Sequence, residues 1–401
     1  MIEGSSFVPG KTVSNSFAKM NISDILKKNN NNDMKKNFKR RDFLKKAGIG
    51  AAAATAVSSF PAPAIAADRI EVNCVATWGR GYPGLGTGAE AVSQRISDLS
   101  DGRIVVNHFA GGERVGPLDV FTEVTSGNAQ MYNSADYYWI GQHPGWGFFA
   151  AVPFGMIATE INGWIRHGGG QELWDELGDE FGLKNFMAGN SGVQMGGWFN
   201  KEINSPDDFK GLKMRIPGLG GMMMSKLGLS VVGVPGGQIY ENLINGTIDA
   251  TEWVGPWNDE RSRFYEAAKY YYWPGCHEPG TLITLGCNKS WLTSLSKTDQ
   301  MIIEHASTVQ NERMLTEYNA NNGAALQRLV NDHGVELREF NEDVIDAMGE
   351  AAEQLYEELA EGNELTGRIL ASFRKSRNEI SGWLEKADSA FFTQRNRVLE
   401  G

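Results

Sequence analysis

Residues 70–109 read IEVNCVATWGRGYPGLGTGAEAVSQRISDLSDGRIVVNHF, and this stretch decides the fold class. Residues 70–77 alternate apolar and polar side chains, as a half-buried strand does. A glycine-rich turn follows, and after it come a helix over about residues 88–99, the turn Asp101-Gly102 and a strand over residues 103–109. Strand, helix and strand in this order begin a parallel sheet covered by helices. The stretch therefore predicts an α/β fold.

The same alternation returns in the second half of the chain. We expect strands at residues 212–216, 229–234 and 248–253, and helices between them at residues 222–227 and 238–244. In both halves a helix ends at a turn containing glycine, directly before a strand. The two pairs of segments are a helix at residues 118–125 before a strand at 129–136, and the helix at 238–244 before the strand at 248–253. Two such units predict two α/β lobes.

The C-terminal part of the chain is helical in pattern, over residues 299–330 and again over residues 343–386. Helices of this length can brace both lobes of one molecule or pack against a second subunit, and the apolar spacing allows either. We expect residues 67–193 to form mainly the first lobe and residues 194–288 mainly the second, with hinge crossings. Residues 289–401 would supply the C-terminal helices.

The N-terminal segment has the features of an export signal. An uncharged, Ala-rich run over residues 47–67 follows the basic motif Lys39-Arg40-Arg41-Asp42-Phe43-Leu44-Lys45, and Ala64-Ile65-Ala66 offers a small-x-small cleavage site. The paired arginines resemble a twin-arginine signal, so we expect residues 1–66 to be an extension and a signal peptide that is cleaved. A membrane anchor is the alternative, but the run is at the short limit for a spanning helix. Translation could start at Met1 or at Met34.

Acidic residues outnumber basic ones along the chain. There are 49 Asp and Glu against 38 Lys and Arg, a formal net charge of −11. Residues 1–66 are themselves basic, so their removal makes the rest of the chain more negative. Such a surface repels phosphate backbones and anionic lipid heads, which argues against nucleic-acid or membrane-surface binding. An anionic ligand would need a local cation to overcome this field.

Signatures of common enzyme classes are missing from the sequence. It contains no GxSxG motif, Walker loop or HExxH motif. The glycine clusters at residues 168–170 and 218–221 lack the strand-to-helix context and spacing of a phosphate-binding loop. His143, His167 and His277 are scattered without an obvious partner. These observations favour a binding protein over an enzyme.

Three cysteines lie beyond the predicted cleavage site: Cys74, Cys276 and Cys287. An odd number cannot form a complete disulfide framework. Cys276 and Cys287 could pair in an oxidising compartment. Since Cys74 and Cys287 lie in apolar strand patterns, buried free thiols are the better interpretation.

Arg215 is the strongest candidate for contact with a ligand. In the strand over residues 212–216 the apolar side chains face the core, and Arg215 is the last cation on the opposite side before Pro217-Gly218 ends the strand. Ligands of open α/β sheets bind beyond the carboxyl ends of the strands. A guanidinium at this position could hold a carboxylate by two parallel hydrogen bonds, which a lysine cannot reproduce. The alternative is a solvated strand arginine.

Four further candidates lie elsewhere in the chain, two of them at the ends of predicted strands. Glu252, followed by Trp253, could form an ion pair with an arginine or ligate a hard cation, Na⁺ or Ca²⁺, that is shared with a ligand. Gln194 could supply a neutral oxygen or be a hydrogen-bonded linker residue, and Glu278 could contact a ligand or occupy a turn. Tyr137 lies in Asp136-Tyr137-Tyr138-Trp139, where aromatic residues beside a charge fit the lining of an amphipathic cleft.

From about Arg69 to its C-terminal helices, the chain resembles the extracytoplasmic solute receptors of tripartite ATP-independent periplasmic (TRAP) transporters. The resemblance lies in Phe209-Lys210-Gly211-Leu212-Lys213-Met214-Arg215, in Gly233-Val234-Pro235 and in the helix-turn-strand over residues 240–249. Glu252-Trp253-Val254-Gly255-Pro256 resembles the branch that binds 2-oxo acids such as pyruvate together with a cation. The resemblance implies a two-lobed periplasmic binding protein, type II-like, with a hinge cleft and long C-terminal helices.

The resemblance also implies roles for individual residues. Arg215 would clamp the ligand carboxylate, and Gln194 would contact both ligand and cation. Glu252 and the carbonyl of Trp253 would ligate Na⁺ or Ca²⁺, and Glu278 would occupy the last matching position. Tyr137, from the aromatic segment, completes the predicted substrate-binding set.

The function implied is binding of a ligand that the protein does not convert chemically. The receptor would close around a small organic acid in the periplasm, a 2-oxo or 2-hydroxy monocarboxylate such as pyruvate, and deliver it to the membrane permease subunits. The C-terminal helices could hold a homodimer. Two alternatives remain at this point: a periplasmic receptor of the ABC type, and an exported enzyme acting on a hydroxy or keto acid.

Overall fold

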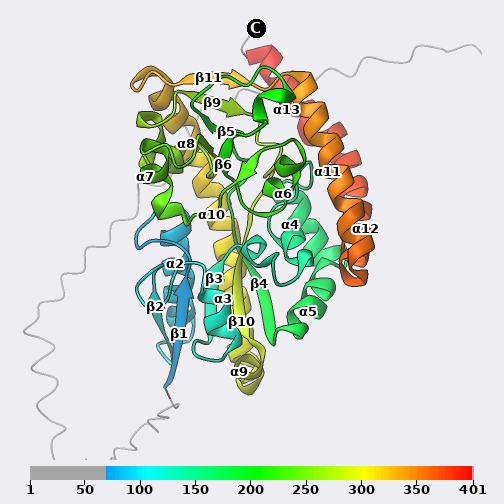
Figure 1. Cartoon of the computed structure of the whole chain (residues 1–401). Coiled ribbons are helices and arrows are strands. Elements are labelled where there is room, and N and C mark those ends of the chain that lie inside the picture. The colour runs from blue at the N-terminus through cyan, green and yellow to red at the C-terminus, as the bar shows by residue number, and fades with distance from the viewer. Residues whose placement is uncertain (1–68, 400–401) are drawn as a thin grey trace, which may run out of the picture. The chain divides into compact units, whose positions relative to one another are not determined.

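The computed structural model describes residues 69–399, and the predicted extension and signal at residues 1–66 lie outside them. Two mixed β-sheets, each accompanied by helices, make up this part of the chain (Figure 1). The α/β fold with two lobes is therefore confirmed. None of the helices within residues 69–399 is long and apolar enough to cross a membrane.

The first sheet has five strands in the order β2-β1-β3-β10-β4. Its strands are β1 (Ile70–Ala76), β2 (Ile104–Phe109), β3 (Met131–Ser134), β4 (Leu183–Asn190) and β10 (Leu282–Asn288). Strand β1 runs parallel to β2 and β3, and β10 runs antiparallel between β3 and β4. The helices of this part of the chain are α2 (Leu85–Leu99), α3 (Val120–Thr125), α4 (Ala158–His167) and α5 (Gly170–Glu180).

The second sheet has six short strands in the order β11-β9-β5-β8-β6-β7. They are β5 (Gly197–Phe199), β6 (Lys213–Arg215), β7 (Ser230–Val231), β8 (Ala250–Thr251), β9 (Tyr270–Trp273) and β11 (Glu336–Glu339). Strand β8 is parallel to β6 and antiparallel to β5, so β6 and β8 end at the same edge. Its helices are α6 (Gly218–Lys226), α7 (Ile239–Ile244) and α8 (Pro256–Arg261).

The chain passes between the sheets three times, and two of these passages are the short crossing segments, residues 191–196 and 274–281. The second crossing returns the chain to the first sheet as β10, although this strand lies in the range that we assigned mainly to the second lobe. Beyond it, α9 (Lys289–Ser294) and α10 (Lys297–Asn331) lead back to the second sheet as β11. The sequence pattern missed β11 because four residues with mixed polarity carry almost no period-2 signal.

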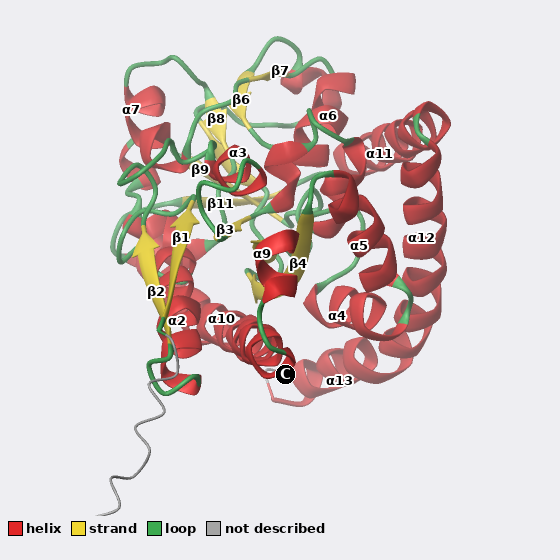
Figure 2. Cartoon of the chain, turned by 90° about the horizontal axis from the view of Figure 1, so that it is seen from below, coloured by secondary structure: helices red, strands yellow, loops and turns green. Residues whose placement is uncertain are grey.

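We call the part of the molecule built around the first sheet the first half and the part built around the second sheet the second half. The C-terminal helices contact elements of both halves. Helix α10 packs on α2 and β4 of the first half and on α8 of the second. Helix α11 (Glu342–Gly362) packs against α6, and α12 (Glu364–Leu384) packs against α4 and α5 (Figure 2). A π-helical turn (Glu385–Ser389) and α13 (Ala390–Leu399) complete the described chain.

The prediction of one helix over residues 343–386 is wrong. The chain leaves the helical conformation at Asn363, where φ is −154° and ψ is 124°. The side chain of Asn363 accepts a hydrogen bond of 2.9 Å from the main-chain nitrogen of Thr366, which caps the next helix. A local cap of this kind competes with continuation of the preceding helix, and Gly362 just before it lowers the cost of stopping.

Several predicted strands are shorter than expected, and the structural context predicted for one glycine cluster is wrong. The segment predicted as a strand at residues 129–136 ends at Ser134, and a 3₁₀ turn over Asp136–Trp139 follows it. The cluster at residues 218–221 does have a strand-to-helix context, because α6 begins at Gly218 directly after β6. The cysteines of the described chain are free thiols, with Cys74 and Cys287 buried, as predicted.

Each half of the molecule buries one carboxylate under aromatic side chains. In the first half, Phe149 stacks between Trp164 and Trp174, and the indole nitrogen of Trp174 donates to Asp136. In the second half, Asp259 accepts from the indole of Trp198 at 2.9 Å and from the hydroxyl of Tyr271 at 2.7 Å. Indole and phenol groups provide apolar area together with a donor, so they satisfy these buried acids locally.

Candidate functional site

Arg215 is the last residue of β6, and the residue is only 2% exposed. The neighbouring Met214 is buried in the hydrophobic core, as the alternation of the strand predicts. The alternative of a solvated strand arginine is therefore wrong. Burying a guanidinium is costly unless its charge is paired and its donors are used, so its partners define the site.

The guanidinium of Arg215 is held on several sides. Its Nη1 pairs closely with Oε1 of Glu252, and its Nε donates to the carbonyl of Val234 at 3.3 Å. Its Nη2 lies 3.4 Å from the hydroxyl of Tyr138, a residue of the first half. The ring of Trp253 lies 5.1 Å from the guanidinium carbon, a cation–π distance. The arginine is thus fixed where the two halves meet.

Glu252 directly follows β8, and its main-chain nitrogen donates to the carbonyl of Arg215 at 3.1 Å. Its side chain is fully buried, and burial raises the pKa of the carboxyl to about 7 against the opposing effect of Arg215. Oxygen Oε1 is paired with Arg215, but Oε2 accepts no hydrogen bond from any described residue. An unpaired carboxylate oxygen at such a depth is the kind of group that a cation or a ligand donor satisfies.

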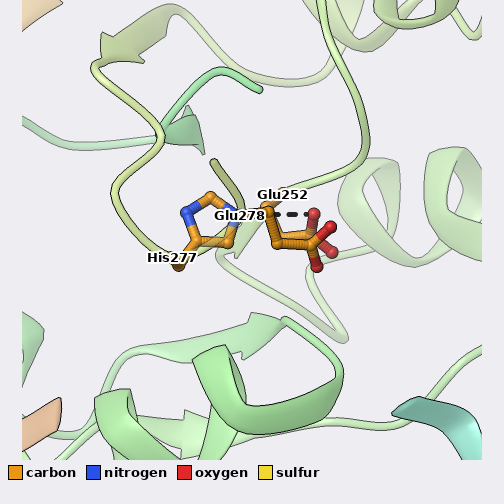
Figure 3. A group of neighbouring side chains, drawn as sticks. All are labelled: Glu252, His277 and Glu278. Atoms are coloured by element: carbon orange, nitrogen blue, oxygen red, sulfur yellow. Dashed lines mark ion pairs between the residues drawn. The ribbon is translucent and has the colours of Figure 1, made fainter. Parts of the chain in front are cut away.

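His277 and Glu278 lie on the second crossing segment and face Glu252 (Figure 3). His277 Nε2 lies 3.6 Å from Glu252 Oε2, and burial lowers the pKa of this imidazole. Burial, together with the nearby charge of Glu252, raises the pKa of the Glu278 carboxyl to about 8, and its Oε2 accepts from the hydroxyl of Thr281. One ligand atom from each of Glu252, His277 and Glu278 lies within 4.8 Å of the other two.

Gln194 comes from the first crossing segment and is linked to Glu278 through Thr281. Its amide nitrogen donates to the hydroxyl of Thr281 at 2.8 Å and to that of Ser191 at 3.1 Å. Both bonds use the amide nitrogen, so the amide oxygen is left without a partner among residues 69–399. Its main-chain nitrogen also donates to the carbonyl of Glu278 at 3.2 Å, which joins the two crossings.

Tyr137 and Trp253 line a small cavity between the two halves. The cavity, of about 10 Å³, is bounded by Tyr137, Tyr138, Gln194, Trp253 and Thr281, among others. Three of its lining residues, Trp78, Tyr138 and Trp253, also line an outer, mainly apolar cavity of about 390 Å³. The indole of Trp253 donates to the hydroxyl of Tyr82 across the halves at 2.8 Å. The inner cavity has room for about one water molecule, so a larger ligand requires the halves to separate.

The charges of the cluster favour binding of a cation. Arg215 brings one positive charge, whereas Glu252 and Glu278 bring two negative charges when ionised. A carboxylate ligand adds a further negative charge at this buried place. The unpartnered oxygens of Glu252 and Gln194 are the ligand type that hard cations such as Na⁺ and Ca²⁺ prefer. The residues therefore fit a cation shared with an anionic ligand.

All six residues singled out in the sequence lie in this one region of the structure. Arg215 and Glu252 are paired, Gln194 is joined to Glu278 through Thr281, and Tyr137 and Trp253 line the cavity beside them. Their roles toward ligand and cation stay predictions. Sequence reasoning missed His277. Its neighbour Glu252 follows β8, far from His277 in the sequence. The position of His277 directly before Glu278 was the only available signal.

Comparisons with known proteins show what the whole chain is similar to. The family model of the bacterial extracellular solute-binding proteins of family 7, DctP, matches residues 77–363. The chain is 37% identical over 352 residues to a monocarboxylate 2-oxoacid-binding periplasmic protein of Nostoc sp.. That alignment covers 86% of this chain and 96% of the Nostoc protein.

Two solved structures have a similar fold. One is a TRAP periplasmic solute-binding protein of Pseudoalteromonas atlantica with bound sodium and pyruvate, which has a TM-score of 0.79 and 37% identity over 81% of this chain and 99% of that one. The other is a TRAP transporter solute-binding protein of Bordetella bronchiseptica, a mixed-occupancy dimer with calcium and picolinate in its occupied site. It has a TM-score of 0.81 and 34% identity over 83% of this chain and 98% of that one.

Proposed function

Because this chain belongs to family 7 of the bacterial extracellular solute-binding proteins, the DctP receptors of TRAP transporters, we propose that it captures a 2-oxo monocarboxylate such as pyruvate in the periplasm. Members of this family bind solutes for transport, and the chain is not an enzyme. The observation that carries the proposal is the buried Arg215, paired with a Glu252 whose second oxygen lacks a partner within the described chain.

In this proposal the ligand carboxylate binds the guanidinium of Arg215, and a cation bridges ligand and protein. Glu252, the amide oxygen of Gln194 and the carbonyl of Trp253 hold the cation, which is Na⁺ or Ca²⁺. Glu278 adds a second negative charge beside it, and Tyr137 covers the ligand from the first half. The unpartnered oxygens of Glu252 and Gln194 support this assignment.

Binding would proceed by opening and closing of the two halves about the crossing segments. The inner cavity has room for about one water molecule, so pyruvate enters only when the halves part. Contacts across the halves then close over it, among them the hydrogen bond from Trp253 to Tyr82. The closed receptor delivers the acid to the permease subunits in the membrane.

We further propose that residues 1–66 direct export by the twin-arginine pathway and are then removed. For the rest of the chain we propose that residues 67–193 form mainly the first lobe and residues 194–288 mainly the second, with hinge crossings, and that the helices of residues 289–401 brace the lobes or dimerise. A homodimer through the C-terminal helices fits the large apolar side chains exposed there, which include Trp383, Phe391 and Leu399. The Bordetella structure, which is a mixed-occupancy dimer, supports a dimer but does not identify its surface.

The function is tested by incubating the purified protein with a panel of C3 to C6 oxo and hydroxy acids. The melting temperature and the NMR spectrum of each acid are followed in parallel. A bound ligand stabilises the protein by RT ln(1 + [L]/Kd), about 2.7 kcal/mol at a hundred times Kd. We expect pyruvate to raise the melting temperature and to remain chemically unchanged. Absence of stabilisation by every acid would refute the proposal.

A further inference from the structure

His277 presents a ring nitrogen to the carboxylates of the site without forming a hydrogen bond there. Its Nε2 and the Oε2 of Glu252 lie 3.6 Å apart, and neither atom has a hydrogen-bond partner among residues 69–399. Both side chains are almost completely buried. A separation of 3.6 Å is too long for a hydrogen bond, so two polar atoms face each other unsatisfied at a depth where that is costly.

The surrounding main chain holds the imidazole in this place. A Cβ at Gly220 of α6 would lie 3.2 Å from the Cβ of His277, so a larger residue there would have to push the crossing segment away by a few tenths of an ångström. The crossing segment is fixed on its other side, where Gly275 donates to the carbonyl of Gln194 at 3.1 Å. The ring therefore points at Glu252 and Glu278 because of the fold, as Figure 3 shows.

The spacing of the three side chains suits a metal ion with short bonds. An ion bound at about 2.1 Å from two atoms that are 3.6 Å apart makes an angle of about 120° between them, which is ordinary for a protein-bound metal. The third atom, from Glu278, lies within 4.8 Å of both others, so a small movement brings all three into reach. Imidazole is a preferred ligand of first-row transition ions, whereas Na⁺ and Ca²⁺ prefer oxygen.

The charges of the cluster also favour a divalent ion. Arg215, Glu252 and Glu278 together carry one net negative charge when both carboxyls are ionised. A divalent ion and one monocarboxylate bring this buried cluster to zero, whereas a monovalent ion leaves one negative charge uncompensated. With both carboxyls ionised, a divalent ion is thus the better electrostatic match, and on binding it must displace the protons that burial favours on Glu252 and Glu278.

We propose that His277 Nε2 ligates the bound cation together with Glu252 and Glu278, and that the site thereby accepts a divalent first-row transition ion such as Zn²⁺ or Mn²⁺. The inference deepens the proposed function, on which it rests, by adding an ion class beside Na⁺ and Ca²⁺ and a ligand beyond the oxygens. Without the imidazole the same place offers oxygen ligands alone.

The test uses the purified protein after removal of metals with a chelator. Calorimetric titrations with ZnCl₂ and with CaCl₂ are compared for the wild type, for His277→Gln and for His143→Gln. His143 is a matched control, since it is also buried with an unpartnered Nε2 but lies outside the Glu252–Glu278 cluster. We expect His277→Gln to weaken Zn²⁺ binding by at least about 10-fold and Ca²⁺ binding by less than about 3-fold. His143→Gln should leave both affinities unchanged.

Two results would overturn the inference. If His277→Gln lowered the affinities for Zn²⁺ and Ca²⁺ equally, His277 would only position Glu252, and if it changed neither, His277 would have no part in the site. Should the variant fail to fold, the wild type loaded with Mn²⁺ decides by pulsed EPR. A nitrogen coupling to Mn²⁺ supports ligation by the imidazole, and its absence refutes it.

Failure of this inference can be told apart from failure of the proposed function. Pyruvate binding is measured on the same wild-type samples with NaCl, CaCl₂ or ZnCl₂ present. Pyruvate binding together with unchanged Zn²⁺ affinity in His277→Gln would refute the ligand role and leave the receptor function intact. A wild type that bound no pyruvate with any cation would refute the function, whatever the Zn²⁺ titration gave.

Discussion

Asp136 and Glu252 are two fully buried carboxylates, and burial raises the pKa of each to about 7. Around Asp136 the hydrogen bonding is complete. One oxygen accepts from the hydroxyl of Tyr132 at 3.1 Å, and the other from the indole of Trp174 at 2.9 Å. Around Glu252 it is incomplete, because Oε2 has no partner among the described residues and faces the bare nitrogen of His277.

The comparison of Asp136 with Glu252 shows that burial and a raised pKa do not by themselves indicate a binding site. The partners of Asp136 all belong to the first half, so this acid is part of one rigid core. The partners of Glu252 come from β6, from the second crossing and, through Arg215, from Tyr138 of the first half. Unsatisfied polar atoms at a place where two halves meet are what identify the receptor site.

Among substitutions that distinguish the two carboxylates, Arg215→Lys at the Glu252 site should have the largest effect on pyruvate affinity. The ammonium keeps the charge but cannot hold a carboxylate by two parallel hydrogen bonds. Loss of such a buried contact costs about 2–5 kcal/mol, so pyruvate affinity should fall about 30-fold or more while the circular dichroism spectrum is kept. Calorimetry measures it, with Arg368→Lys as control, since Arg368 forms an exposed pair with Glu176. Retained affinity in Arg215→Lys would remove Arg215 from the site.

A smaller effect is expected from Glu252→Gln. The amide keeps the size of the side chain but removes the charge that holds the cation. Pyruvate affinity should fall by about 10- to 100-fold, and its dependence on Na⁺ or Ca²⁺ should become weaker. Glu358→Gln is the control, because Glu358 pairs with Lys226 at the surface. If Glu252→Gln responded to both ions as the wild type does, Glu252 would be only the partner of Arg215.

Asp136→Asn should leave pyruvate affinity unchanged and alter only the pH dependence of stability. The ordinary pKa of this carboxyl is 3.8, and in the folded protein it is about 7. The folded state therefore binds an extra proton between about pH 4 and pH 7. The free energy of unfolding falls as pH rises through this window, by up to about 1.4 kcal/mol per pH unit, and the contribution is fully present only below it.

Asparagine cannot titrate and resembles the protonated acid in shape. The free energy of unfolding of Asp136→Asn should therefore increase relative to that of the wild type between pH 5 and pH 8. Urea denaturation at the two pH values measures the difference. Parallel pH profiles for the two proteins would show that Asp136 is not the titrating acid. A loss of pyruvate binding would break the distinction between the two carboxylates.

Local patterns predicted the parts of the molecule that depend on one segment. The alternation of residues 212–216 placed Arg215 opposite the core, and the strand-helix order predicted two α/β lobes. The cluster of Glu252 with His277 and Glu278 could not be derived in this way. It forms only when β8 and the second crossing meet, and tertiary contacts of this kind leave no periodic signal.

The break at Asn363 and the strand β11 were missed for a related reason. A single capping side chain ends one helix and starts another within an amphipathic pattern that continues on both sides. The short β11 exists because β9 offers it a parallel partner, with Leu337 beside Tyr271. In both cases a few hydrogen bonds, within a helix cap or between two strands, override the hydrophobic pattern that is read over longer sequence windows.

The central claim is that a cation and the carboxylate of a 2-oxo acid together satisfy the incompletely paired Arg215–Glu252 cluster. Its most direct test is the calorimetric titration of the metal-stripped protein with pyruvate, in Na⁺-free buffer and again with NaCl or CaCl₂. The claim predicts one pyruvate per chain and an affinity at least about 10-fold higher with the cation. Equal affinity with and without cation, or no binding in any buffer, would contradict it.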